Sequence, residues 1–311
     1  MPEQQTTIAA PVRIEGVGLH SGAPATLTIQ PAGVNQGIVF VRRDLNGAEI
    51  PAAHRHVQKS SLATRLARGG ASVSTVEHLL SALRGLGVDN ARIDLDGPEV
   101  PILDGSARPF AEPILAAGIR SQRAERRYLT LRRPVSVSLG DKEILAIPAN
   151  ELRVTYAIDF PHPAIGYQAL TAGITGHDYA ESIAPARTFC LLRDVDDMKR
   201  SGMVRGGSLD NAVVVGDEGV MNESLRFPDE FVRHKILDLI GDLALLGAQL
   251  RAHVIAFKGG HRLHAALLGR MLASRASWDL VSSEERLPAE HLQRFAHLTD
   301  RLLPRPVPVH A

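Results

Sequence analysis

The chain has 311 residues, a length that fits one large domain or two of about 150 residues each. Apolar residues make up 44% and charged residues 22%, which excludes a disordered chain and predicts a folded, water-soluble protein. The 35 basic and 34 acidic side chains give a formal net charge of +1, so a general nucleic-acid-binding function, which needs clustered basic charge, is excluded. Any phosphate that the protein binds should therefore meet a local site.

Cys190 is the single cysteine, which excludes an internal disulfide and a cysteine-rich zinc site. Any metal must then be held by His, Asp or Glu. The N-terminus lacks a basic segment followed by an apolar stretch, and the sequence holds no run of 18 apolar residues. We therefore expect a cytoplasmic protein without a membrane span.

The first half starts with strand-like segments at 16–20, 25–30 and 37–43, followed by a charged segment at 54–70 that we expect to be an irregular insertion. An apolar helix at 74–86 comes next and ends at a glycine, as helices often do. Glu77 and His78 are neighbours in this helix and point about 100° apart, so one can ligate a metal while the other addresses a bound water. Taken alone, Glu-His is a common dipeptide, and an ordinary polar pair at a helix end is the better explanation.

A basic, charged run at 118–134 lies between the halves, and we place the boundary near residue 125, giving domains 1–125 and 126–311. The second half repeats the layout: strands within 128–139, 144–149 and 152–160, an insertion at 187–215 with a short helix and a strand, and an apolar helix at 230–247. The glycines that end the two helices are 160 residues apart (Gly87 and Gly247). Sheets followed by helices predict an α+β fold, here of two similar domains with one insert each.

The helix at 230–247 is apolar around most of its circumference, which predicts a buried helix. His234, Asp238 and Asp242 follow one another at intervals of four residues and share one face. This polar stripe is either the solvated edge of the helix or a metal site, because buried carboxylates are rare unless paired or bound to metal. With His78, the first two residues of the stripe make two nitrogen ligands and one oxygen ligand with an open position, the pattern of catalytic zinc.

The segment KGGHRLH at 258–264 combines two glycines, which let the backbone approach a ligand closely, with Lys258. Its His261 is either a loop histidine without a role or part of a site. We expect His264 to lie on a helix surface.

Seven segments together resemble one known family: GVGLHSG (16–22), TVEHLLSALRGLGVDN (75–90), PILDGSA (101–107), ARTF (186–189), GGSLDNAVVV (206–215), EFVRHKILDLIGDL (230–243) and KGGH (258–261). They resemble the UDP-3-O-acyl-N-acetylglucosamine deacetylases, zinc amidases of lipid A biosynthesis in Gram-negative bacteria. The resemblance implies two α+β domains with helices between outer sheets, and hydrolysis of the substrate's N-acetyl group to acetate and a free amine.

Residue roles follow from the same resemblance. It implies a zinc ion bound by His78, His234 and Asp238. It implies four catalytic residues: Glu77 as base, His261 as acid, Asp242 as the group that orients His261, and Thr188 as a donor to the oxyanion. It implies five substrate-binding residues: Lys235, Lys258, Phe160 as the stacking partner of uracil, Phe189 and Lys142.

The sequence leaves three points open. A His/His/Asp site also accepts Fe²⁺ in place of Zn²⁺. Cys190 and Leu191 stand where the family commonly has Gly-Phe, so the acyl-chain length that the second insert accepts is not predicted. The competing interpretations are a zinc amidase for another acylated amino sugar and a non-catalytic binding module stabilised by metal. We expect a monomer that acts on a small-molecule substrate.

Overall fold

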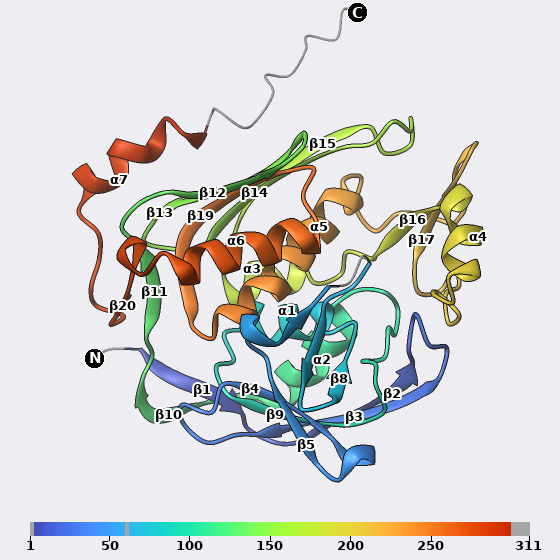
Figure 1. Cartoon of the computed structure of the whole chain (residues 1–311), viewed down its shortest axis with the longest axis horizontal. Helices are drawn as coiled ribbons and strands as arrows, with labels where there is room; N and C mark the ends of the chain where they lie inside the picture. The colour runs from blue at the N-terminus through green and yellow to red at the C-terminus, as the bar shows by residue number, and fades with distance from the viewer. Residues whose placement is uncertain (1–2, 60–61, 300–311) are drawn as a thin grey trace, which may run out of the picture.

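The computed structural model of the protein describes residues 3–59 and 62–299, so the outermost ends of the two expected domains lie outside the described residues. Figure 1 shows a layered molecule in which helices lie between one sheet from the first half and another from the second half. The prediction of a mixed α+β protein is confirmed. Within the described residues, no helix is long and apolar enough to cross a membrane.

The first-half sheet has five strands in the order β2-β3-β9-β4-β5. These strands are β2 (Val12–Val17), β3 (Pro24–Pro31), β4 (Ile38–Arg42), β5 (Ala48–Pro51) and β9 (Ala91–Asp96). Helices α1 (Glu77–Gly85) and α2 (Arg108–Ala117) flank β9 in the chain, and β1 (Gln4–Ile8) pairs separately with β10 (Ile119–Glu125).

Two expectations for this half are wrong. Segment 54–70 is not irregular throughout: β6 (Val57–Gln58) and β7 (Arg65–Arg68) form a small sheet with β8 (Ala71–Val73). In β7 the exposed arginines flank buried Leu66, so charge hid the alternation of a strand. The expected strand at 16–20 lies earlier, because β2 ends at Val17 and the following residues form a turn.

The second-half sheet has seven strands. They are β11 (Tyr128–Leu131), β12 (Val135–Leu139), β13 (Lys142–Pro148), β14 (Arg153–Asp159), β15 (Tyr167–Gly173), β19 (Gln249–Phe257) and β20 (Trp278–Val281). Strands β13, β14 and β19 are buried almost throughout because both faces of the sheet are covered. Helices α5 (Glu230–Leu243) and α6 (His261–Ala273) cover the inner face, and α7 (Ala289–Ala296) packs Phe295 over the outer face.

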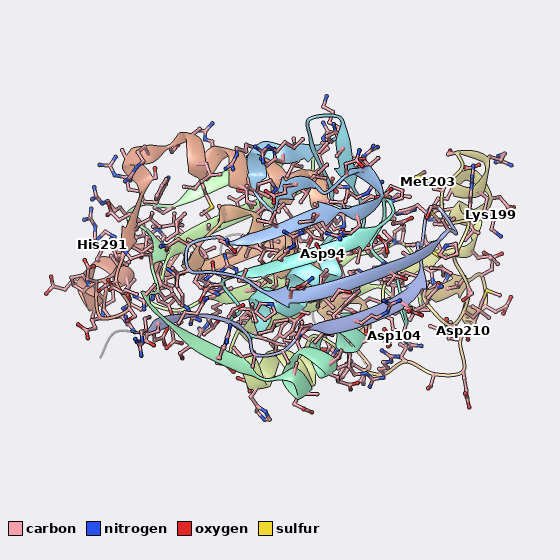
Figure 2. All side chains as sticks on the ribbon, turned by 90° about the horizontal axis from the view of Figure 1, so that it is seen from below. Asp94, Asp104, Lys199, Met203, Asp210 and His291 are labelled. Atoms are coloured by element: carbon pink, nitrogen blue, oxygen red, sulfur yellow. The ribbon has the colours of Figure 1, made fainter. Side chains whose placement is uncertain are left out.

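The second insert contains the helix and strand that the sequence predicts. After α3 (Gly176–Ser182), the chain forms β16 (Phe189–Leu191), α4 (Leu192–Arg200), β17 (Val213–Gly216) and β18 (Gly219–Val220). Figure 2 marks this insert by Lys199 and Met203 at one end of the molecule, whereas His291 of α7 lies at the other end. No residue of α4 is buried, so the insert projects from the core.

The two sheets share a strand order. Five strands of the second sheet run β12-β13-β19-β14-β15, and in both sheets the central strand is antiparallel to one neighbour and parallel to the other. Each central strand follows a helix and a glycine with positive φ, Gly87 at 76° and Gly247 at 75°. The glycines predicted as helix stops therefore take the conformation that a Cβ disfavours.

Helices α1 and α5, one from each half, cross in direct contact. A Cβ placed on Gly241 of α5 would lie 2.1 Å from the backbone oxygen of Glu77 at the start of α1. Only a residue without a side chain allows this approach. The crossing brings the polar residues of both helices together.

Gly241→Ala should therefore destabilise the fold and lower activity together. Overpacking costs about 1–3 kcal/mol, of which the better helix propensity of alanine returns up to about 1 kcal/mol. Denaturant unfolding measures the free-energy change, with Gly173→Ala as a control because its new methyl group meets open space. An unchanged free energy of unfolding in Gly241→Ala would mean that the two helices separate freely at this point.

Candidate active site

The polar stripe of α5 is buried. His234, Asp238 and Asp242 are each 2% exposed, and the helix is buried along most of its length. The alternative of a solvated helix edge is therefore wrong. The stripe faces the first turn of α1, where Glu77 and His78 are 3% and 4% exposed.

The start of α1 is set by a strained residue. Thr75 has φ 57°, which β-branched residues rarely adopt, and its hydroxyl donates a 2.8 Å hydrogen bond to the buried Glu99 carboxylate. The same carboxylate accepts hydrogen bonds from the backbone N–H groups of His20 and Ser21. This network fixes the turn that leads into α1 and so places Glu77 and His78 in its first turn.

Two histidines and one carboxylate converge with the spacing of a metal site. Asp238 Oδ1 lies 3.2 Å from His234 Nε2 and 3.8 Å from His78 Nε2. Tetrahedral ligands about 2.1 Å from a metal are about 3.4 Å apart, so both separations fit one ion. His234 Nδ1 donates to the Ala186 carbonyl at 3.0 Å, which leaves Nε2 free to ligate.

Electrostatics favour the ligating forms of these groups. Burial, together with His234, lowers the pKa of His78 to about 3, so its ring is neutral near pH 7. Burial opposes the charge of Asp238, but His234 and Lys235 hold the pKa of this carboxyl well below its usual value. Lys235 Nζ donates to Asp238 Oδ2 at 2.6 Å, leaving Oδ1 toward the two histidines.

Glu77 and His261 face each other beside these ligands. Glu77 Oε1 lies 3.8 Å from His261 Nε2, and Glu77 Oε2 accepts a 3.0 Å hydrogen bond from the Thr64 backbone N–H. Burial raises the pKa of Glu77 to about 7. The negative charges of Asp238 and Asp242 also raise it, whereas the charge of His261 lowers it. A carboxyl with a pKa near 7 can both accept and release a proton close to neutral pH.

Asp242 gathers three hydrogen-bond donors. Its Oδ2 accepts from His261 Nδ1 and from His264 Nδ1, each at 2.8 Å, and its Oδ1 accepts from the Thr64 hydroxyl at 2.5 Å. Burial alone would lower the pKa of His261, but the charge and hydrogen bond of Asp242, with Asp238 and Glu77, raise it to about 10. Conversely, against the effect of burial, His261 and His264 lower the pKa of Asp242 to about 2.

Sequence reasoning misplaced one residue here and missed two. His264 is 0% exposed, so the expectation of a helix surface is wrong. Its position three residues after His261 puts it on the inner face of α6, against α5. The two missed residues are Thr64 and Tyr156, and the Tyr156 hydroxyl lies 3.0 Å from His264 Nε2. Neither residue belongs to a sequence pattern that indicates a role in the site.

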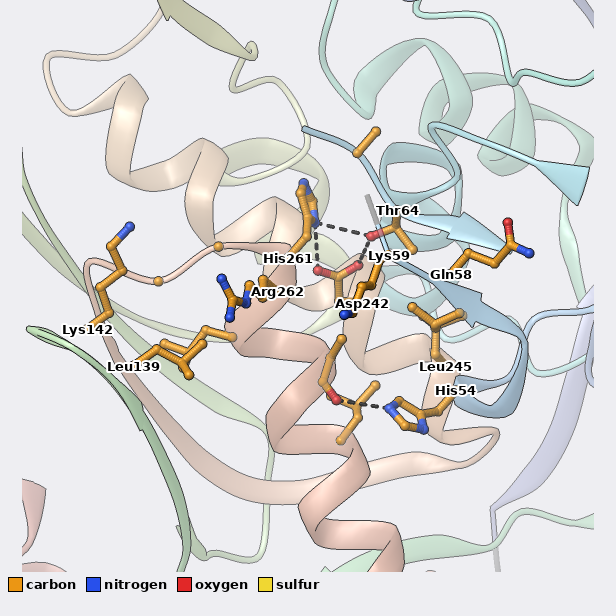
Figure 3. Close-up of a pocket in the computed structure, with 17 residues that line it drawn as sticks. His54, Gln58, Lys59, Thr64, Leu139, Lys142, Asp242, Leu245, His261 and Arg262 are labelled. Carbon is orange, nitrogen blue, oxygen red and sulfur yellow. Dashed lines mark hydrogen bonds and ion pairs between the residues drawn. The ribbon is translucent and has the colours of Figure 1, made fainter. Parts of the chain in front are cut away.

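A pocket of about 1060 Å³ opens next to this network. Figure 3 shows His261, Asp242 and Thr64 joined by hydrogen bonds in its wall. Lys142 lines the same pocket, so the structure brings this predicted contact residue to the site. Lys59 and Arg262 add two further basic side chains to the lining.

Three of the predicted contact residues adjoin the metal ligands. The Phe189 ring centroid lies 5.5 Å from that of Phe160 and 6.5 Å from that of His234, and Lys235 Nζ lies 5.6 Å from it. Lys258 pairs with Asp159 at 3.0 Å and with Asp141 at 3.3 Å, and these carboxylates raise its pKa. Phe160, Phe189 and Lys235 thus lie next to the candidate metal ligands, whereas Lys258 is paired with two carboxylates.

Thr188 is fixed through its backbone, whereas the structure gives no hydrogen bond for its hydroxyl among the described residues. Its N–H donates to the Gly105 carbonyl at 2.8 Å, and its own carbonyl accepts from the Val213 N–H at 2.7 Å. The preceding Arg187 is held by buried Glu230 at the start of α5, with a 2.9 Å contact. The strand end that carries Thr188 is thus tied to the helix that carries His234.

Comparisons with known proteins identify the family of this chain. The family model described as "LpxC: UDP-3-O-acyl N-acetylglycosamine deacetylase" matches residues 5–273. A UDP-3-O-acyl-N-acetylglucosamine deacetylase from Myxococcus xanthus is 48% identical over 91% of this chain and 90% of its own length. A protein of the same name from Solibacter usitatus is 48% identical over 90% of this chain and 95% of its own length. Another, from Acidithiobacillus ferrooxidans, is 45% identical over 91% of this chain and 94% of its own length. The chain belongs to the LpxC family of UDP-3-O-acyl N-acetylglycosamine deacetylases.

Proposed function

We propose that this protein is a zinc-dependent amidohydrolase that removes the N-acetyl group of UDP-3-O-acyl-N-acetylglucosamine in lipid A biosynthesis. The observation that carries the proposal is the crossing of α1 and α5, where three candidate metal ligands lie beside a carboxylate and a histidine that face each other at 3.8 Å. Family membership and the names of the relatives support this substrate. A site that only binds metal needs neither of the two facing groups.

The donor set fits a zinc ion. His78, His234 and Asp238 offer two ring nitrogens and one carboxylate oxygen, all within 4.8 Å of one another. Zinc supplies a Lewis acid that polarises the amide carbonyl and acidifies a water. Fe²⁺ suits the same three ligands, so we propose zinc as the working ion and treat iron as the alternative that metal analysis must test.

The chain's own residues move the protons. Glu77 accepts a proton from the attacking water. The Thr64 N–H donates to Glu77 Oε2 and so holds the carboxylate in place. As the bond from water oxygen to the acetyl carbon forms and the C–N bond breaks, the amine nitrogen needs a proton. Nδ1 of His261 is bonded to Asp242, so its Nε2 hydrogen faces the site and supplies that proton.

Thr188 is the residue that we propose as oxyanion donor. The Ala186 carbonyl accepts a hydrogen bond from His234, one of the proposed metal ligands. Thr188 follows two residues later, so its backbone lies close to these ligands. A hydroxyl that is not already bonded to protein is free to donate to charge that develops in the transition state. The arrangement supports this role.

Five residues are proposed to bind the sugar nucleotide: Lys235, Lys258, Phe160, Phe189 and Lys142. A protein with net charge near zero must neutralise a diphosphate locally, and lysine does so as a point charge. The edge-to-face pair of Phe160 and Phe189 offers a ring surface to the base. Lys258 has φ 52°, and its backbone N–H donates to the Ala157 carbonyl at 2.9 Å.

Lys258→Ala should raise KM for the sugar nucleotide by about 10-fold or more without emptying the metal site, because it removes a charge-assisted contact to the diphosphate. Steady-state kinetics and metal content measure this. Arg294→Ala on α7, at the far end of the molecule, controls for the loss of one positive charge. A wild-type KM in Lys258→Ala would remove this lysine from the binding site.

We also propose that residues 1–125 and 126–311 are two copies of one α+β unit. The common strand order, with the same mixture of parallel and antiparallel neighbours, supports this division. The position of one insert between the fifth strand and the crossing helix of each half also supports it. Each half would contribute one helix to the site, α1 or α5.

Chelation tests the metal-dependent reaction. Dialysis against a chelator should abolish acetate release, and stoichiometric zinc should restore it. Parallel restoration with Fe²⁺ under anaerobic conditions compares the two ions. A substrate panel that includes other N-acetylated amino sugars tests the substrate, and equal turnover without the UDP and 3-O-acyl groups would contradict it.

A further inference from the structure

Asp242 binds more donors than the proton transfer requires. One carboxylate oxygen accepts from two imidazoles, His261 and His264, at 2.8 Å each. His264 is completely buried, and the reaction as described gives it no part. Two rings that share one carboxylate oxygen must divide its negative charge between them.

Tyr156 determines which nitrogen of His264 carries hydrogen. Its hydroxyl lies 3.0 Å from His264 Nε2, and both side chains are 0% exposed. Burial raises the pKa of Tyr156 well above its ordinary value, so the hydroxyl keeps its hydrogen. Among the described residues, His264 Nε2 is the hydrogen-bond partner of this hydroxyl, and the Asp242 carboxylate at Nδ1 can only accept, so we infer that the hydroxyl donates to Nε2. Nε2 is then an acceptor, and the ring hydrogen sits on Nδ1, which faces Asp242.

Burial favours the neutral form of the His264 ring against the charges of the nearby carboxylates. Asp242 faces it from α5, Tyr156 from β14 and His261 from within α6, with Asp238 one turn further along α5. Burial lowers the pKa of His264 even though Asp242 opposes this effect, and the charge of His261 adds to it. The positive charge of the cluster therefore resides on His261.

We propose that His264, locked by Tyr156 with its hydrogen on Nδ1, is a positioning residue that sets the orientation of Asp242 and limits how tightly this carboxylate holds the proton on His261. The proposal rests on the proposed function, since His261 must give up its proton in each turnover. A carboxylate bonded to His261 alone would hold the imidazolium more strongly and make it a weaker acid. The second donor draws part of that charge away.

His264→Leu tests this, because leucine fills the space without a donor. It should raise the pKa of His261, move the basic limb of the kcat/KM profile up by about one pH unit, and lower kcat about 10-fold. His264→Asn, whose amide N–H stands near the position of Nδ1, should bring the limb back toward wild type. Tyr156→Phe removes the lock and should shift the limb in the same direction by a smaller amount.

The readouts separate positioning from simple support of the fold. The proposal is overturned if kcat falls equally in His264→Leu and His264→Asn while the basic limb of the kcat/KM profile stays at its wild-type pH. An unchanged limb in His264→Leu with full metal content also overturns it. Denaturant unfolding shows whether each variant is folded under the assay conditions.

Imidazole ¹⁵N NMR of the metal-loaded wild-type protein tests the hydrogen position without any turnover. We expect a neutral His264 with its hydrogen on Nδ1 between pH 6 and 9, whereas a hydrogen on Nε2 overturns the inference. If this pattern is present but the protein releases no acetate from UDP-3-O-acyl-N-acetylglucosamine, the proposed function fails and the coupling of the two histidines stands.

Discussion

His234→Ala should produce a folded protein without bound metal, whose turnover is no higher than that of chelator-treated wild type. The substitution removes one of the three proposed ligands, and the remaining His78 and Asp238 leave two open positions, one more than a catalytic zinc site keeps. The ring lies at the side of Phe189, so part of the loss is packing rather than ligation. Metal analysis and unfolding experiments on the same preparation separate the two.

His253→Ala is the matched control. This histidine is also buried, at 8% exposure, and hydrogen-bonds to Thr155 within the second-half sheet rather than to the site. It should lose a comparable amount of stability and keep its metal. A folded His234→Ala protein with one equivalent of bound zinc would remove His234 from the ligand set.

Glu77→Ala and His261→Ala should each lower kcat/KM by about 10²- to 10⁴-fold while the metal stays bound, since this is the usual contribution of a positioned base or acid. Activity needs Glu77 ionised and His261 protonated, so the wild-type profile should rise and then fall with pH. The basic limb reflects His261, whose pKa Asp242 raises to about 10 against the effect of burial. His261→Ala should remove that limb.

Asp242→Asn tests the sign of this coupling. It removes the negative charge that stabilises the imidazolium, so the pKa of His261 should fall and the basic limb should move to lower pH. Asparagine keeps the size and one acceptor oxygen, so the hydrogen bond from Thr64 can remain. If the limb stays in place in both Asp242→Asn and His261→Ala, another group donates the proton to the leaving amine.

Local periodicity predicted the residues that share a helix. The spacing of four residues places His234, Asp238 and Asp242 on one face of α5, and the apolar remainder of the helix indicates burial. The helix ends at Gly87 and Gly247 were also predictable, because helices commonly end at a residue with positive φ and glycine adopts that conformation most easily. These signals extend over a few residues of the chain.

Contacts between distant segments had no such signal. Thr64 meets Asp242 across 178 residues, and Tyr156 meets His264 across 108. Both depend on the packing of the first insert and of β14 against the helices, which no local pattern specifies. His264 was misjudged for a related reason: a polar residue in a helix predicts solvent unless its buried partners are known.

The most direct measurement is mass spectrometry of UDP-3-O-acyl-N-acetylglucosamine incubated with the zinc-loaded protein. The crossing of α1 and α5 predicts loss of a single acetyl group, with the 3-O-acyl chain and the UDP group intact, and a loss of this conversion in Glu77→Ala. A substrate that remains unchanged after incubation with fully zinc-loaded, folded wild-type protein would contradict the assignment of this site to deacetylation.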